Sequence, residues 1–153
     1  MADSDEIFLA LRGDQEDAAA QVAAVLGLEF KRDFRDETGE LSYVGQARSF
    51  DGLIGIFIGP NSFQPEPDEV QAMDGYPVVV DVQSRVHKDA QPVETRLAFE
   101  ALVGALPDVP ALLSHNVEYL VAAYLPGRGI HSFEPVITPD VEDVETWRSW
   151  VRC

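Results

Sequence analysis

This chain of 153 residues lacks disulfide-forming cysteines and long apolar runs. Its one cysteine is Cys153, so an intrachain disulfide is excluded, which is typical of a reducing compartment. No stretch approaches the ~18 apolar residues of a membrane-spanning helix. The first residues, MADSDEIFLALRGD, are acidic and lack the basic start and apolar centre of a signal peptide. We therefore expect a soluble, cytoplasmic protein with no membrane partner.

Basic residues are also scarce. Lysine and arginine number 11 against 27 aspartates and glutamates, which gives a net charge of −16 with neutral histidines. Phosphate binding depends on Lys and Arg displacing counterions, so we expect no nucleic-acid partner. Such acidity serves solubility alone in many proteins. It also favours a basic protein partner, because opposite charge accelerates association at low salt.

Motifs for catalysis and cofactor binding are missing. The segment DGLIGIFIGPNSF (51–63) contains three glycines, but it lacks the lysine of a phosphate-binding loop, and Pro60 removes a backbone donor. We interpret it as a buried strand followed by a turn. No Gly-x-Ser-x-Gly elbow occurs. His87, His115 and His131 lack the paired spacing typical of a metal site. We expect no catalytic residue, no metal and no cofactor.

Apolar periodicity divides the chain into strands and helices. Strands are predicted, from alternating or continuous apolar residues, over 6–12, 28–49 (a hairpin turning near Gly39), 53–59, 77–86 and 130–137. Helices are predicted, from apolar residues three and four apart, over 14–27, 91–107 and 138–153. Asp14 and Thr138 are the predicted N-caps. The segment 116–125 fits either a strand or a short helix.

This order of elements predicts one α+β domain comprising residues 1–153. Neighbouring strands without helices between them argue against a parallel, doubly wound sheet. The sequence instead predicts a mostly antiparallel sheet with two main helices on one face and a C-terminal helix. The first half together with the second helix is compatible with an expanded ferredoxin-like order.

Acidic residues gather in the proline-rich loop and in the last helix, where we expect a basic partner to bind. The carboxylates predicted to contact it are Glu66, Asp68, Glu69, Asp140, Glu142 and Asp143. An exposed aromatic residue, Phe63 or Tyr76, is the predicted anchor. In general character the chain is similar to bacterial immunity and antitoxin proteins, which are small, acidic and free of catalytic motifs. That likeness implies a non-enzymatic inhibitor that covers a basic partner such as a toxin.

Two alternatives remain open at this point. A small enzyme or ligand-binding domain would use a pocket near His115, Glu118, Tyr124 and Arg128. A homo-oligomeric structural protein would bury exposed tryptophan or valine residues by self-association. Trp147 and Trp150 are three residues apart, so they share one helix face and are expected to dock the last helix on the core.

Overall fold

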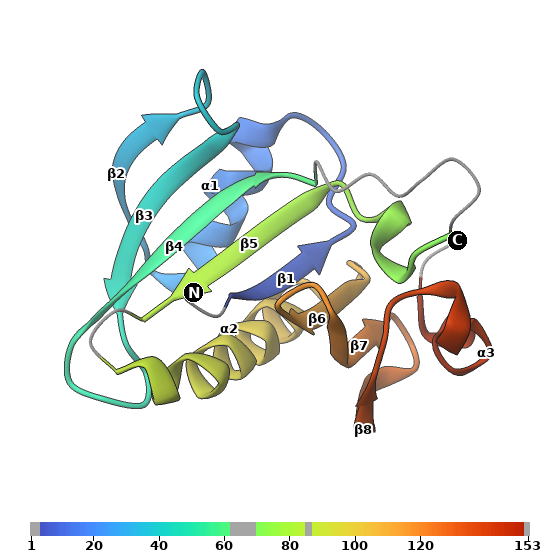
Figure 1. The fold of residues 1–153 in the computed structure, drawn as a ribbon. Coiled ribbons are helices and arrows are strands. Elements are labelled where there is room, and N and C mark those ends of the chain that lie inside the picture. The colour runs from blue at the N-terminus through green and yellow to red at the C-terminus, as the bar shows by residue number, and fades with distance from the viewer. Residues whose placement is uncertain (1–3, 62–69, 85–86, 152–153) are drawn as a thin grey trace.

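The computed structural model describes residues 4–61, 70–84 and 87–151, which form one eight-stranded sheet with helical segments packed against it (Figure 1). The strands are β1 (Asp5–Leu9), β2 (Glu29–Phe34), β3 (Glu40–Gln46), β4 (Leu53–Pro60), β5 (Val78–Gln83), β6 (Ala111–His115), β7 (Tyr119–Leu125) and β8 (Gly129–Ile137). The helices are α1 (Gln15–Leu26), α2 (Gln91–Ala105) and α3 (Val144–Trp147). Four 3-10 turns accompany them, namely η1 (Ala72–Gly75), η2 (Lys88–Ala90), η3 (Val141–Asp143) and η4 (Arg148–Trp150).

The order across the sheet is β2-β3-β4-β5-β1-β6-β7-β8, and every neighbouring pair is antiparallel. Its inner strands, β4-β5-β1-β6, are joined through α1 and α2 in the ferredoxin-like order. The β2–β3 hairpin widens one edge of this unit, and β7 and β8 widen the other. The predicted α+β class and the expanded ferredoxin-like order are therefore confirmed.

Local signals place α1 where the sequence predicts it. The Asp14 side chain accepts a hydrogen bond of 2.7 Å from the backbone N–H of Asp17, which caps the first turn. Gly27 ends the helix with a φ of 66°, a left-handed conformation that costs glycine little because it has no Cβ. The first helix thus begins and ends as predicted.

The segment 116–125, which the sequence leaves open, contains a strand. Asn116 and Val117 have φ values of 55° and 58°, and the Glu118 N–H donates to the His115 carbonyl at 3.1 Å. Positive φ at both central residues of a turn matches the right-handed twist of the strands that it connects. The chain therefore reverses sharply after β6 and returns as β7, so the helical alternative is wrong.

Two apolar cores lie on opposite faces of the sheet. On one face, α1 and α2 cover alternate residues of the inner strands, including Val80 of β5 and Phe99 of α2. On the other face a smaller core includes Phe8, Met73 and Trp147, which come from β1, η1 and α3. This second cover is short, and in Figure 1 no labelled helix lies in front of β3, β4 and β5. The described helices therefore leave this face of the sheet uncovered over those strands.

The C-terminal helix is present but much shorter than predicted. Its α-helical part has only 4 residues, with the 3-10 turns η3 and η4 on either side. Thr138 does not cap it; instead the Thr138 N–H and hydroxyl donate to the Asp143 carboxylate at 2.8 and 2.9 Å. Trp147 is buried, as predicted, and its indole N–H donates to the Asp140 carbonyl at 2.9 Å. Trp150 is half-buried.

A buried carboxylate joins α2 to the turn between β3 and β4. The Glu94 side chain accepts hydrogen bonds from the backbone N–H groups of Arg48 at 2.8 Å and Ser49 at 2.6 Å. Glu94 is only 1% exposed. Without it, two backbone donors in this turn would lose their partner, and such donors are costly to bury.

We expect Glu94→Ala to lower the free energy of unfolding by about 2–4 kcal/mol, because it removes two hydrogen bonds to a charged acceptor. Urea denaturation followed by circular dichroism measures the change. Glu100→Ala is the matched control on the same helix, where the carboxylate is 46% exposed and pairs only with Arg96. An equal effect of the two substitutions would contradict this role for Glu94.

Candidate functional site

The alternation of side chains along β1 and β5 brings two carboxylates to the uncovered face of the sheet. Val80 and Val82 of β5 point into the larger core, so Asp81 between them points the other way. In β1, Ile7 points into the larger core and Glu6 takes the opposite face. The register pairs Glu6 directly with Asp81 across the two strands. Residues paired in this way have Cβ atoms about 4.5–5.5 Å apart.

The two carboxylates differ in the hydrogen bonds that they accept. Glu6 is 6% exposed and accepts a hydrogen bond of 2.8 Å from the Ser114 hydroxyl of β6. Among the residues that the structure describes, Asp81 accepts one long contact, of 3.4 Å, from the Gln83 amide at Oδ2. Its other oxygen, Oδ1, is buried and has no hydrogen-bond partner in the described part of the chain. The pair therefore contains a carboxylate oxygen that has lost water without gaining a donor.

Burial and like charge raise the pKa values of both groups. The pKa of Asp81 is raised to about 7, chiefly by burial and next by the neighbouring charge of Glu6, while the Gln83 hydrogen bond lowers it in part. Burial is also the main reason why the pKa of Glu6 is raised, against hydrogen bonds from Ser4 and Ser114 that lower it. Near neutral pH, Asp81 therefore holds a proton in a substantial share of molecules. A cation placed against the pair would favour the ionised form.

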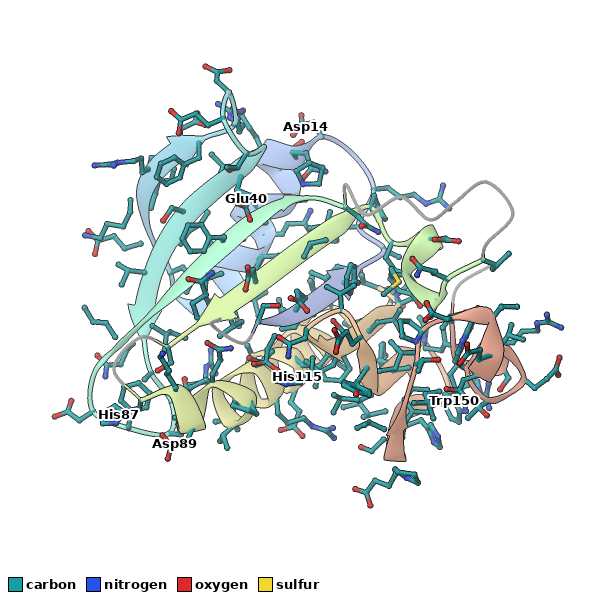
Figure 2. The ribbon with its side chains drawn as sticks, in the orientation of Figure 1. Asp14, Glu40, His87, Asp89, His115 and Trp150 are labelled. Atoms are coloured by element: carbon teal, nitrogen blue, oxygen red, sulfur yellow. The ribbon has the colours of Figure 1, made fainter. Side chains whose placement is uncertain are left out.

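A groove of about 340 Å³ lies next to Glu6 on this face. We call it the sheet-face groove, and its lining comes from β1, β3, β4, β5 and two turns: Glu6, Phe8, Thr38, Glu40, Gly59, Pro60, Asn61, Val79 and Val117. Glu40, from the start of β3, is the second carboxylate of this lining, and Figure 2 labels it on the strands that lie in front of α1. Val117 has a positive φ, which is unusual for a β-branched residue. The groove is therefore acidic with apolar walls.

A second groove, of about 500 Å³, lies between η1 and the C-terminal helical turns. We call it the valine groove, after the residues that give it an apolar lining: Val70, Val141, Val144 and Val151. Val70 and Val141 are 55% and 58% exposed. Backbone and side-chain bonds join its two walls, since the Ala72 N–H donates to the Pro139 carbonyl at 2.9 Å and the Gln71 amide to Asp140 at 2.8 Å.

Part of the predicted partner surface lies beside the valine groove. Asp140 and Glu142 are exposed near it, as is Asp74 of η1. Asp143 is half-buried, and its carboxylate accepts a hydrogen bond from the Thr138 hydroxyl. The other predicted contact residues, Phe63, Glu66, Asp68 and Glu69, lie outside the residues that the structure describes.

The expectation that Tyr76 is an exposed anchor is wrong. Its side chain is 0% exposed. The turn η1 directs it into the smaller core together with Met73, which is also 0% exposed, and Ala72. The sequence around Tyr76 is polar and rich in proline, which is typical of an exposed loop, so no local signal indicates this burial. Only the second core, built from distant segments, explains it.

The pocket predicted from four residues does not form as one site. His115 and Glu118 lie at one end of the β6–β7 hairpin, and Tyr124 and Arg128 lie toward the other, about 17 Å away along an extended strand. His115 contacts Asp5 at 2.7 Å, whereas the Tyr124 hydroxyl donates to the Pro107 carbonyl at 2.6 Å.

Arg128 has a structural contact instead. Its guanidinium carbon lies 3.8 Å from the centre of the Trp150 ring, and it also donates to the Ser149 carbonyl. His131 of β8 stacks on the same indole, with ring centres 4.3 Å apart. Figure 2 shows His115 and Trp150 well separated in the molecule. Arg128 and His131 therefore hold the C-terminal turns against β8.

Sequence reasoning missed Glu6, Asp81 and Glu40 as site residues. A signal for Asp81 was present, because an aspartate between valines in VVVDV places a charge on a half-buried strand. Its pairing with Glu6 had no local signal, since the two residues are 75 positions apart and meet only through the sheet register.

Among the described residues, no group of three or more His, Cys, Asp or Glu side chains is arranged to hold a metal ion. None of the described helices is long and apolar enough to cross a bilayer.

We expect Asp81→Asn to stabilise the protein at pH 8 by roughly 2–4 kcal/mol, and to change little at pH 4. The pKa of Asp81 is raised from 3.8 to about 7, so folding binds a proton. The stabilisation that this proton provides is complete below about pH 4 and is lost as the pH rises through about 7. Urea denaturation at several pH values measures the difference between variant and wild type.

The exposed carboxylate of Asp51 provides the matched control, as Asp51→Asn. Because this side chain is exposed, Asp51→Asn should change the free energy of unfolding at pH 8 far less than Asp81→Asn does. A carboxyl resonance of Asp81 that titrates near pH 4 in a carbon-13 NMR experiment would contradict the raised pKa.

Comparisons with protein-family models, with curated proteins and with solved structures find no match for this chain. The case for a function therefore rests on the residues of the chain itself and on the contacts that they make.

Proposed function

We propose that this protein is a small acidic binding protein that holds a basic protein partner on the sheet face opposite α1 and α2. The observation that carries the proposal is the Glu6–Asp81 pair, in which two carboxylates lie directly opposite each other and the described residues offer no donor to one buried oxygen. Like charges placed opposite each other destabilise a sheet. A cation supplied by a partner would relieve the repulsion between the two carboxylates.

The sheet-face groove has the size and composition to accept one long basic side chain. Its volume of about 340 Å³ exceeds what a few water molecules fill. Glu6 and Glu40 supply charge, while Phe8 and Val79 offer apolar surface for the methylene stem of a lysine or arginine. An arginine would add donors in a fixed fork that suits a carboxylate.

The valine groove supports the same proposal with an apolar contact. It lies on the same side of the sheet, because η1 and α3 form the smaller core there. Exposed valines beside Asp74, Asp140 and Glu142 combine an apolar centre with a charged rim, which is typical of protein–protein interfaces. The net charge of −16 would steer a basic partner toward this surface.

An inhibitor that covers a basic toxin, as immunity and antitoxin proteins do, is the function class that fits these features best. Such a protein needs no catalytic residue, and its acidic face competes with the natural substrate of the toxin. The chemistry of this surface favours a partner with a basic surface, to which the protein would act as an acidic receptor.

The test is capture at 50 mM and 300 mM salt from the source cell, followed by calorimetry with the purified partner. We expect a protein of basic pI, with an affinity that falls steeply with salt and drops at least tenfold in an Asp81→Asn, Glu40→Gln variant. The variant also reports on stability, so circular dichroism first establishes that it is folded.

A matched control is available on the opposite side of the molecule. Asp89, in η2 before α2, is exposed, and Figure 2 shows it well away from Glu40, which lines the sheet-face groove. Asp89→Asn should leave the affinity unchanged. A captured partner that is acidic, or that binds wild type and the double variant equally, would overturn the proposal.

A further inference from the structure

A separate cavity of about 370 Å³ lies on the helix side of the sheet, beside α2. It forms because α2 packs on β5, β1 and β6, while the sheet continues outward as β7 and β8. Residues Pro92 and Arg96 of α2 line one wall, and Ser132 and Glu134 of β8 line another. This cavity lies on the opposite face of the sheet from the surface proposed for a basic protein.

The lining combines an apolar floor with groups of both charges. Leu113 and Pro92 provide apolar surface, and Asp5, Arg96 and Glu134 provide charge. A few polar groups placed around an apolar surface in a cavity of a few hundred cubic ångströms are typical of small-molecule sites. The volume corresponds to about a dozen water molecules, which is enough for a free amino acid.

Asp5 lines this cavity and is only 4% exposed. Its two oxygens contact the Gln91 amide at 2.8 Å and the His115 ring at 2.7 Å. These contacts hold the carboxylate in place, but the amide is neutral and the imidazole is charged only when protonated. A carboxylate can accept about four hydrogen bonds, and the described side chains supply these two to Asp5.

Arg96 supplies the opposite charge on the wall that α2 forms. Its Nε donates to Glu100 at 3.2 Å and its Nη1 to Ser132 at 3.1 Å, which joins α2 to β8. A guanidinium has five donors, and the described residues accept hydrogen bonds from two of those of Arg96. Among the described residues, no ion pair joins Arg96 to Asp5 or to Glu134. The cavity thus holds opposite charges that are kept apart.

We propose that this cavity binds a small zwitterion of the amino-acid type, with its ammonium group at Asp5 and Glu134 and its carboxylate at Arg96. A ligand with both charges bridges the groups that the fold keeps separate. A simple amine or a simple carboxylic acid satisfies only one of them. The site should therefore bind the zwitterion more tightly than the corresponding amine or the corresponding carboxylic acid.

The test uses the full chain in thermal-shift and calorimetric titrations with individual L-amino acids at concentrations up to 10 mM. For any amino acid that binds, the matching amine without the carboxylate and the matching acid without the amine are titrated next. We expect each half to bind at least tenfold more weakly than the zwitterion. Absence of binding by every amino acid at 10 mM would overturn the proposal, as would equal binding of the zwitterion and either half.

Two variants assign the binding to this cavity. Arg96→Gln should weaken the zwitterion at least tenfold and leave the affinity of the matching amine unchanged, because only the carboxylate contact is lost. Glu134→Gln should weaken the zwitterion and the amine alike. Arg148→Gln is the matched control, since Arg148 is exposed on η4 at the other groove. Binding that Arg96→Gln and Arg148→Gln affect equally would overturn the assignment.

Discussion

The structure depends on a central strand that carries two carboxylates into the middle of the sheet. All five residues of β1 are buried, and β5 and β6 pair with it on either side. A buried carboxylate is costly unless donors or opposite charges meet it. Gln91 of α2 and His115 of β6 contact Asp5, and Ser114 of β6 contacts Glu6. These contacts place α2 and the β6–β7 hairpin relative to the same strand.

Because successive side chains of a strand point to opposite faces, Asp5 and Glu6 serve two different surfaces. Asp5 faces α2 and the cavity beside it, where a positive Arg96 is also present. Glu6 faces the uncovered side, where its direct neighbour is Asp81. One face therefore presents separated opposite charges and the other presents adjacent like charges. This contrast is the reason for assigning a zwitterion to the first face and a basic partner to the second.

The short C-terminal segment decides how much of the second face is covered. Trp147 and Val151 close the smaller core, and Trp150 is held from outside by Arg128 and His131. In Figure 1 the described part of this segment lies away from β3 and β4, two of the strands that line the sheet-face groove. The same segment contributes Val141 and Val144 to the valine groove. The C-terminal segment therefore covers part of this face of the sheet and also forms part of the candidate contact surface.

The sequence alone determined the features that depend on neighbouring residues. Alternating valines specified β5, Asp14 and Gly27 specified the ends of α1, and the order of strands and helices specified an α+β sheet of ferredoxin-like order. Each of these rests on interactions within a few positions along the chain, which the residue pattern states directly.

Tertiary structure decided the rest, because it depends on which distant segments meet. The register between β1 and β5 placed Glu6 opposite Asp81, and the second core buried Tyr76 within a polar stretch. The reversal at Asn116 and Val117 placed His115 at the far end of a hairpin from Arg128, so four residues close in sequence did not form a pocket. Strand register and the burial of loops depend on contacts between distant segments, and a local sequence pattern does not indicate those contacts.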